Sequence, residues 1–286
     1  MQPISGTTRI FGLIADPVAH TLSPLMHNAA LDFLGFDGVY VAFHVMPHRL
    51  GDAMTGMKSL GIAGLNVTVP HKTAVMRYCD TIDPEAAAVG AVNTLVHAEG
   101  GLTGYNTDVF GFRESLRRDA GFETLPGHVC VIGAGGAACG VVYACATSGD
   151  VQEMTILNRT VERAVALADE MGGYGTCTVK AGPLDHAESL YAAELIVNTT
   201  TMGMHPFIDE TPVRDAAIFH SGQVVYDIVY NPVETRFLRE AAAAGAATVN
   251  GLGMLAWQGA RSLSLWTGCD APGEIMHATL LRHFGI

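Results

Sequence analysis

Short apolar stretches alternate with helix-forming stretches along most of the chain, and this alternation restricts the fold more than any other feature. From residue 128 onward, four such stretches are typical of short, buried strands. They are HVCVIG (128–133), QEMTILN (152–158), AELIVNT (193–199) and QVVYDIV (223–229). Strands of this kind need cover on both faces, so the pattern predicts a doubly wound parallel sheet with helices on either side.

The first part of the chain predicts another open α/β sheet. Strands are expected at 9–14, 38–45 and 62–69, a strand pair at 93–106 turned at 99–101, and a helix starting at 107–108. Ser23 is expected to cap a helix whose first position is Pro24. Two closing helices are expected over 251–268 and 272–285. The two halves are therefore expected to be separate domains.

A glycine-rich turn, Gly133-Ala134-Gly135-Gly136-Ala137-Ala138, joins the first strand of the later half to a helix. It fits the pattern GxGxxG/A, in which one glycine permits the tight turn and the next lets the backbone approach a pyrophosphate. The helix N-terminus then faces the negative charge. Such turns are common, but this one follows a predicted strand and opens a helix, which favours a dinucleotide site.

The segment after the second strand of that half indicates which dinucleotide binds. An NAD site would place an acidic residue here, against the ribose hydroxyls. This chain instead has Asn158-Arg159-Thr160, with Arg163 one helical turn later. A guanidinium can hold a 2′-phosphate that a carboxylate would repel, so the sequence favours NADP over NAD. In the alternative interpretation, Arg159 is an ordinary surface cation and Thr160 caps the next helix.

Composition excludes several partners. The chain has 286 residues with 16 Lys and Arg against 28 Asp and Glu, a formal charge of −12. Neutralising phosphates along a nucleic acid needs a basic face, so no nucleic-acid partner is expected. The six cysteines form no CxxC pair and the start of the chain lacks a signal-peptide pattern, which predicts a cytoplasmic protein. The histidines show no HExxH spacing, so no metal site is expected.

One uncharged stretch, residues 129–147, is long enough to cross a membrane and contains a GxxxG pattern. Its glycines cluster near the start and no second stretch of this kind exists in the sequence. A strand, turn and helix explain it better than a membrane span, so no membrane partner is expected.

Several polar residues fall where strands of the first half are predicted to end. They are Thr21, Ser23, Asn66, Thr68, Asn93, Asn106 and Asp108, together with Lys72 in the stretch GLNVTVPHK. In an open α/β sheet, ligands bind outside the carboxyl ends of the strands. Hydroxyls, amides, one cation and one carboxylate suit a small polyhydroxylated substrate, and a lysine beside a carboxylate can move a proton during alcohol oxidation. Taken singly, each residue has an ordinary structural interpretation as a cap, a turn or a surface ion pair.

The ordered set of motifs resembles the shikimate dehydrogenase family over nearly the whole chain. The motifs are PVAHTLSPLMHN, GLNVTVPHK, GAVNT, GYNTD, GAGGAA, NRT, NTTTMGM, YDIVYNP and GLGMLAWQGA. The resemblance implies a substrate domain over 1–108 and about 252–286, and an NADP-binding Rossmann domain over 109–251. It implies NADP-dependent, reversible reduction of 3-dehydroshikimate to shikimate, in aromatic amino-acid (chorismate) biosynthesis.

The resemblance also implies roles for individual residues. Lys72 is the expected acid/base, and Asp108 its partner, which orients it and binds a ring hydroxyl. Thr21 and Ser23 match the pair that holds the substrate carboxylate. Expected contacts to the rest of the substrate are Thr68, Asn93 and Gln258, with Tyr230 closing over the carboxylate. Expected NADP contacts are Gly133, Ala134, Gly135, Gly136, Ala137, Asn158, Arg159, Thr160, Arg163, Thr199, Ile228 and Gly251.

Two departures from the family pattern leave alternatives open. Thr21 stands where the family usually has serine, and its extra methyl lies near the carboxylate, where quinate carries a further hydroxyl. A quinate, quinate/shikimate or aminoshikimate dehydrogenase using NAD or NADP is therefore an alternative, as is a non-catalytic dinucleotide sensor. Pro84 replaces an acidic residue often found near the cofactor, so no contact is assigned there. The chain is expected to act as a monomer or homodimer.

Overall fold

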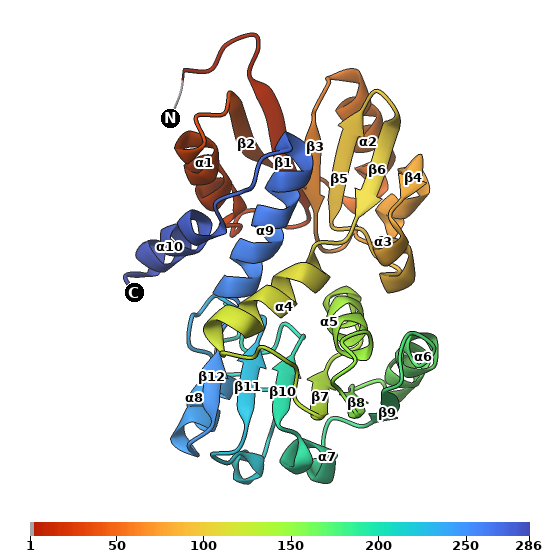
Figure 1. Cartoon of the computed structure of the whole chain (residues 1–286), viewed down its shortest axis with the longest axis vertical. Helices are drawn as coiled ribbons and strands as arrows, with labels where there is room; N and C mark the ends of the chain where they lie inside the picture. The colour runs from red at the N-terminus through yellow and green to blue at the C-terminus, as the bar shows by residue number, and fades with distance from the viewer. Residues whose placement is uncertain (1–2) are drawn as a thin grey trace. The chain divides into compact units, whose positions relative to one another are not determined.

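The computed structural model describes residues 3–286, and the chain forms two compact units (Figure 1). Unit 1 comprises Met1–Gly111 and Leu255–Ile286, and unit 2 comprises Phe112–Met254. The chain passes from one unit to the other inside two helices, α4 (Asp108–Asp119) and α9 (Leu252–Thr267). The C-terminal helices therefore return to the first unit, as the family resemblance implies.

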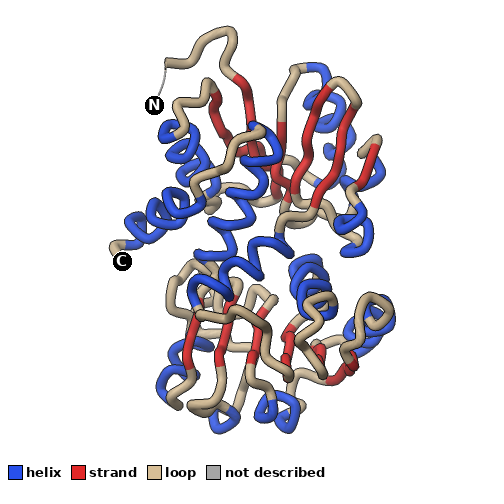
Figure 2. The backbone as a smooth tube through the Cα atoms, in the orientation of Figure 1, coloured by secondary structure: helices blue, strands red, loops and turns tan. Residues whose placement is uncertain are grey.

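Unit 1 contains a mixed six-stranded sheet in the order β2-β1-β3-β5-β6-β4 (Figure 2). Its strands are β1 (Arg9–Ala15), β2 (Gly38–His44), β3 (Gly64–Val67), β4 (Thr81–Ile82), β5 (Thr94–Ala98) and β6 (Gly101–Tyr105). β1 runs parallel to both β2 and β3, whereas β5 and β6 form the expected antiparallel pair. β3 is shorter than predicted because the chain leaves the sheet before Pro70, which has no N–H to donate.

Ile14, Leu65 and Leu95 of this sheet belong to one apolar core. The helices of unit 1 pack around the sheet. They are α1 (Ser23–Phe33), α2 (Leu50–Ser59), α3 (Pro84–Val89), most of α9 and α10 (Gly273–Phe284). Short 3₁₀ turns lie at η1 (Pro47–Arg49) and η2 (Ala74–Tyr78). α1 and α10 lie against each other.

The start of α1 differs from the prediction. Leu22, not Ser23, occupies the cap position, and no side chain caps the helix there. Ser23 is the first helical residue, and its backbone N–H donates to the hydroxyl of Thr21 at 3.3 Å. Thr21 thus supplies the acceptor expected of Ser23, which leaves the buried Ser23 hydroxyl free to bond elsewhere.

Unit 2 contains a six-stranded, fully parallel sheet in the order β12-β11-β10-β7-β8-β9. Its strands are β7 (His128–Ile132), β8 (Glu153–Leu157), β9 (Thr178–Gly182), β10 (Leu195–Asn198), β11 (Val224–Asp227) and β12 (Ala247–Val249). Numbered within the unit, this is the order 3-2-1-4-5-6 of a dinucleotide-binding fold, with the switch point between β7 and β10. The predicted doubly wound sheet is confirmed.

Helices join the strands of unit 2. They are α5 (Gly136–Ala146), α6 (Val161–Met171), α7 (Ala187–Ala192), α8 (Arg236–Ala243) and the 3₁₀ turn η3 (Ala216–Ile218). The uncharged stretch 129–147 divides into β7, a turn and α5, so the alternative of a membrane span is wrong for it. Within residues 3–286, no helix has both the length and the apolar character that crossing a bilayer requires.

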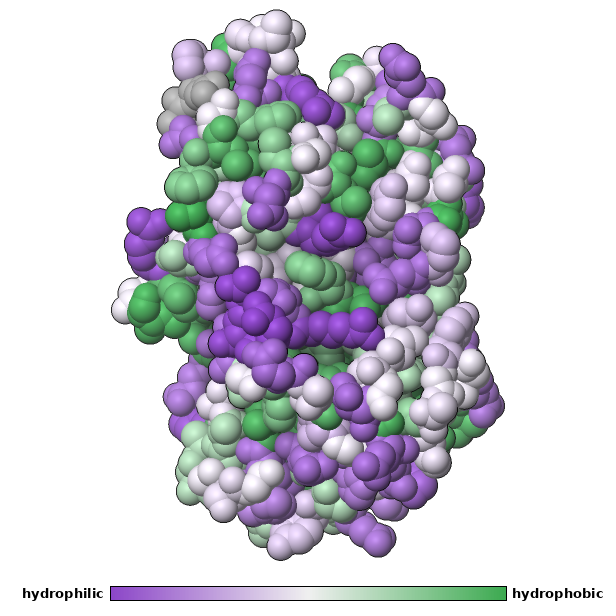
Figure 3. Space-filling model, viewed as in Figure 1, coloured by the Kyte–Doolittle hydropathy of each residue, from purple (hydrophilic) through white to green (hydrophobic). Residues whose placement is uncertain are grey.

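Exposed apolar side chains are scattered. Phe33, Leu60 and Phe207 are each more than half exposed and lie on different segments of the chain. On the face shown in Figure 3, hydrophobic residues occur among hydrophilic ones in small groups. Scattered exposure of this kind is ordinary for protein surfaces.

Candidate active site

Lys72 and Asp108 meet in unit 1 although 36 residues separate them in the sequence. The Lys72 Nζ donates to Asp108 Oδ2 at 2.6 Å, and the two side chains are only 15% and 8% exposed. A pair this sheltered is held in one geometry, unlike an exposed surface pair, which water and salt screen. A lysine so placed can give a proton to, and take one from, an alcohol or ketone oxygen.

Local structure fixes the backbone on both sides of this pair. Lys72 follows β3, and its carbonyl accepts from Val92 N–H at 2.9 Å. The buried His71 beside it bonds through Nε2 to the carbonyl of Val45 at 2.6 Å. Asp108 is the first residue of α4, and its own N–H donates to the side chain of Asn106 at 2.9 Å. Asn106 therefore satisfies a free donor at the helix start.

The second carboxylate oxygen of Asp108 is also held. Asn93 Nδ2 donates to Asp108 Oδ1 at 2.8 Å and to Thr107 Oγ1 at 3.0 Å. Asn93 Oδ1 in turn accepts from the backbone N–H of Thr107 at 2.8 Å. Both oxygens of Asp108 thus have a defined donor, so the carboxylate plane is fixed relative to Lys72.

A buried network of hydroxyl and amide groups continues from Asn93. Ser262 Oγ, on α9, lies 2.8 Å from Thr94 Oγ1 and 3.2 Å from Thr107 Oγ1, and accepts from Asn66 Nδ2 at 2.9 Å. Ser262 donates to the backbone carbonyl of Gln258 at 3.0 Å. Buried networks whose members are all satisfied are rigid, so α9 and the strand ends are held in register by these bonds.

The network extends to Ser23 through Tyr40. The Tyr40 hydroxyl donates to Asn66 Oδ1 at 2.8 Å. Burial raises the pKa of Tyr40, and a hydrogen bond with Ser23 acts in the opposite direction. Thr21 Oγ1 donates to Ser23 Oγ at 3.2 Å. The structure therefore connects the residues expected to hold a carboxylate with those around Lys72 and Asp108.

The other expected substrate contacts lie in different surroundings. Thr68 is partly buried at the end of β3, and within residues 3–286 no hydrogen bond of its hydroxyl is recorded. Gln258 is also partly buried, donates through Nε2 to Leu255 O at 2.9 Å and accepts weakly from Thr107 at 3.4 Å. Tyr230 belongs to unit 2, on the segment after β11, where burial raises its pKa.

Sequence reasoning missed Tyr40, Thr94, Thr107 and Ser262. Ser262 lies one helical turn after Gln258, so it shares a helix face with an expected site residue, and this spacing was the available signal. Thr107 directly precedes Asp108 in GYNTD. Tyr40 and Thr94 lie within strands, where nothing in the pattern separates them from ordinary core positions.

In unit 2, the glycine turn leaves space at the start of α5. Gly133 has φ +115°, and a Cβ there would overlap Thr199 Oγ1. Gly135 caps α5 without a side-chain hydrogen bond, and within residues 3–286 a Cβ on it would meet no atom within 4 Å apart from those of Gly135 and its chain neighbours. The first turn of α5 carries no acidic residue. Free N–H groups beside open space at a helix N-terminus fit a pyrophosphate.

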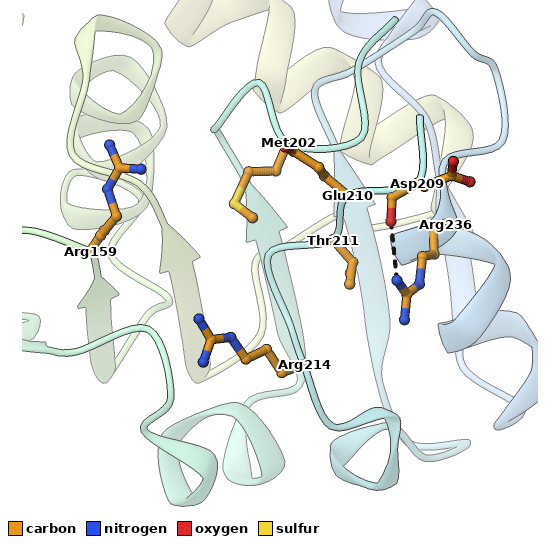
Figure 4. A pocket seen from close by; sticks show the side chains of 7 residues that line it. All are labelled: Arg159, Met202, Asp209, Glu210, Thr211, Arg214 and Arg236. Carbon is orange, nitrogen blue, oxygen red and sulfur yellow. Dashed lines mark hydrogen bonds between the residues drawn. The ribbon is translucent and has the colours of Figure 1, made fainter. Parts of the chain in front are cut away.

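The residues after β8 lie at the surface. Arg159 and Arg163 are exposed, and Asn158 Nδ2 donates to Thr160 O at 2.9 Å. Thr160 occupies the cap position of α6, as in the alternative interpretation, although its side chain makes no cap hydrogen bond. Arg159 lines an open cavity of about 400 Å³ together with residues of the segment after β10 (Figure 4).

A buried carboxylate, Asp227, ties together the strand ends beside Ile228 and Tyr230. Asp227 is fully buried and accepts from Asn198 Nδ2 at 2.9 Å, Val229 N–H at 3.0 Å and Thr235 Oγ1 at 2.7 Å. Burial raises its pKa to about 6, although these hydrogen bonds act against the shift. Gly251 lies against this segment, because a Cβ on it would overlap Ile228 O.

Comparison with known proteins identifies the family. Three family models match successive parts of the chain: the shikimate dehydrogenase substrate binding domain at 13–95, shikimate / quinate 5-dehydrogenase at 120–237, and the shikimate 5'-dehydrogenase C-terminal domain at 251–281. A shikimate dehydrogenase (NADP(+)) of Methanopyrus kandleri is 46% identical over 283 residues, covering 98% of this chain and 97% of that protein. The chain belongs to the shikimate dehydrogenase family.

Solved shikimate dehydrogenases share the whole architecture. One in complex with NADP+ superposes with a TM-score of 0.93 at 41% identity, covering 99% of this chain and 98% of that one. Another, from Thermus thermophilus in complex with NADP(H) and shikimate, has a TM-score of 0.87 at 40% identity, covering 96% and 99%. The two-domain fold expected from the sequence is confirmed by this shikimate dehydrogenase architecture.

Proposed function

We propose that this chain is an NADP-dependent oxidoreductase acting on a CH–OH group, which reversibly reduces 3-dehydroshikimate to shikimate. The observation that carries the proposal is the sheltered pair of Lys72 and Asp108 at 2.6 Å, embedded in a satisfied polar network. A non-catalytic dinucleotide sensor would have no need to hold an acid/base pair in one geometry. Unit 1 binds the substrate and unit 2 binds NADP.

The residues of unit 1 bind and orient the substrate. Thr21 and Ser23 hold its carboxylate through their hydroxyls, which already lie 3.2 Å apart. Thr68, Asn93 and Gln258 contact its hydroxyls and ring, and Tyr230 of unit 2 closes over the carboxylate. These contacts supply the positioning that brings the reacting carbon to the cofactor.

Lys72 carries the proton. NADPH, when bound, supplies the hydride that reaches the carbonyl carbon of the substrate. As charge develops on the carbonyl oxygen, the Lys72 ammonium donates a proton to it, and the lysine is left as a neutral amine. In the reverse direction the amine takes the hydroxyl proton as hydride leaves. Asp108 holds Nζ in place and binds a neighbouring hydroxyl of the substrate.

NADP fits unit 2 at the glycine turn and the segment after β8. Gly133 to Ala137 approach the pyrophosphate, and Asn158, Arg159, Thr160 and Arg163 surround the 2′-phosphate. Thr199, Ile228 and Gly251 border the remainder of the cofactor. The open space at Gly135 and the uncapped start of α5 support this placement.

A preference for quinate is the second candidate, because Thr21 adds a methyl beside the carboxylate site. The family description that matches 120–237 includes quinate as well as shikimate. We expect kcat/KM to be highest for shikimate with NADP in a panel of shikimate and quinate, each tested with NADP and NAD. A higher value for quinate would establish the second candidate, and no turnover of either alcohol would contradict both.

The protein is further proposed to act in the cytoplasm as a monomer or homodimer. No cysteine within residues 3–286 forms a disulfide, which suits a reducing compartment. Sedimentation equilibrium with and without NADP measures the assembly state, and a larger oligomer would contradict the proposal.

A further inference from the structure

The cavity beside Arg159 is lined by a further arginine that the family motifs do not include. Arg214 lies on the segment between β10 and η3, and lines the same 400 Å³ cavity. Figure 4 shows the Arg214 side chain directed to the side on which Arg159 lies, with Thr211 and Arg236 farther from Arg159. Arg159 follows the end of β8 by two residues, whereas Arg214 lies 16 residues after β10 and two residues before η3.

The arginines that line this cavity differ in whether a carboxylate pairs with them. Arg236 is neutralised, since its Nε lies 2.7 Å from Glu240 Oε1 and its Nη1 donates to Asp209 O at 3.1 Å. For Arg159 and Arg214, no ion pair or hydrogen bond is recorded among residues 3–286, although the carboxylates of Asp209 and Glu210 line the same cavity. Two arginines that line one cavity without a recorded partner, in a chain with so few cations, favour an anionic ligand.

An unpartnered hydroxyl lies in the same cavity. Thr211 Oγ1 is buried, and among residues 3–286 it has no hydrogen-bond partner. Leaving such a group unpaired is unfavourable, so a ligand that bonds to it recovers free energy. Met202 lines the cavity next to these polar groups and offers an apolar surface suited to a base.

We propose that Arg214, assisted by Thr211, is a specificity-determining residue for the 2′-phosphate of the cofactor. The adenosine lies in the cavity, and its 2′-phosphate lies between the guanidinium groups of Arg159 and Arg214. This rests on the proposed use of NADP and adds to it, because the family motifs place phosphate contacts only on the segment after β8. A phosphate monoester carries up to two negative charges, which a pair of arginines matches.

The test uses two ligands that differ only by that phosphate, adenosine 2′,5′-bisphosphate and 5′-AMP, with calorimetric measurement of the dissociation constants. We expect Arg214→Gln to weaken binding of the bisphosphate about tenfold or more, the loss of one charged hydrogen-bond partner, and to leave 5′-AMP binding unchanged. Thr211→Val should weaken the bisphosphate two- to fivefold, roughly, without lowering stability, because it removes an already unpaired hydroxyl. Arg239→Gln, an exposed arginine of α8, is the matched control.

Three other outcomes would each contradict the inference, and they can be told apart. If the wild-type protein binds both ligands equally, the proposed preference for NADP fails and the inference fails with it. If the wild-type protein discriminates and Arg214→Gln discriminates equally well, the inference alone is wrong. If Arg214→Gln weakens both ligands by the same factor, Arg214 acts on the whole nucleotide and not on the 2′-phosphate, which also overturns the inference.

Discussion

The two candidate sites are built in opposite ways. In unit 1, the polar groups around Lys72 and Asp108 bond to one another, and both oxygens of Asp108 have donors within the protein. In unit 2, the start of α5 lacks a cap, Gly135 borders open space, and no partner is recorded for Arg159 or Arg214 within residues 3–286.

This difference follows from what each site has to do. A group that transfers a proton must be held in one position before the substrate arrives, since misplacement is costly in rate. A site that only binds an anion gains affinity from donors that have no other partner, because the ligand then supplies the missing acceptors. Internal pairing therefore marks the chemical site here, and unpaired donors mark the binding site.

The strongest test of this comparison removes the cation of the chemical site. Lys72→Ala should lower kcat by about 10²–10⁴-fold, the usual contribution of a positioned acid/base group. Binding of shikimate, followed by equilibrium titration, should persist because the Thr21 and Ser23 hydroxyls remain. Lys58→Ala is the control, since Lys58 pairs with Asp80 at the surface of the same unit at 2.9 Å. A kcat within tenfold of wild type would remove Lys72 from the mechanism.

A second test concerns the two buried aspartates. Asp108 has a lysine partner, whereas Asp227 has only neutral donors, and burial raises the pKa of Asp227 from 3.8 to about 6. Between these values the folded state binds the proton more tightly than the unfolded state, so this group's contribution to stability falls as pH rises and is level above pH 6. The size of the fall is roughly 3 kcal/mol.

Asp227→Asn removes this titration. We expect the free energy of unfolding of the variant, relative to wild type, to increase by roughly 2 kcal/mol between pH 4 and pH 7, measured by urea denaturation. Asp169→Asn, at an exposed position of α6, should show no such trend. A difference between variant and wild type that does not change with pH would show that Asp227 keeps its ordinary pKa when folded.

The third test distinguishes a glycine that the fold requires from a glycine that leaves room for the cofactor, both in the turn before α5. Gly133→Ala should destabilise unit 2, because φ is +115° and the new Cβ overlaps Thr199. Gly135→Ala should leave stability unchanged, since its Cβ meets nothing, but should weaken NADP binding roughly tenfold by entering the space a pyrophosphate needs. Fluorescence titration with NADPH and thermal unfolding measure the two effects. Unchanged NADPH affinity in Gly135→Ala would show that no phosphate approaches this turn.

Much of the fold could be predicted because the decisive strands are largely apolar. β7, β8, β10 and β11 are buried on both faces, so their sequences carry an unambiguous signal. β9 alternates exposed and part-buried positions at the sheet edge, and β12 has only three residues, so neither was predicted. The predicted cap residue of α1 was wrong. Thr21 and Ser23 both carry a hydroxyl, and the sequence does not show which of them accepts a hydrogen bond from the backbone at the helix start.

The candidate site could be predicted only as far as residue types allow. Lys72 and Asp108 were paired as candidates through polar residues at strand ends, but the 2.6 Å contact depends on how β3, β5 and α4 come together. Ser262 was missed because its contribution arises from packing of α9 against strands some 170 residues earlier in the chain. Networks that connect distant segments leave little trace in a single sequence.

The smallest expected effect concerns the carboxylate end of the chemical site. Thr21→Ser keeps the hydroxyl that donates to Ser23 at 3.2 Å and removes only a methyl. Removing one methyl in a pocket changes discrimination by about 1 kcal/mol, so the ratio of kcat/KM for shikimate over quinate should fall about two- to fivefold as room appears for the extra hydroxyl of quinate. Thr55→Ser, at an exposed position of α2, is the matched control. An unchanged ratio would show that the Thr21 methyl does not face the substrate. Thr21 would then contribute only through the hydrogen bonds of its hydroxyl.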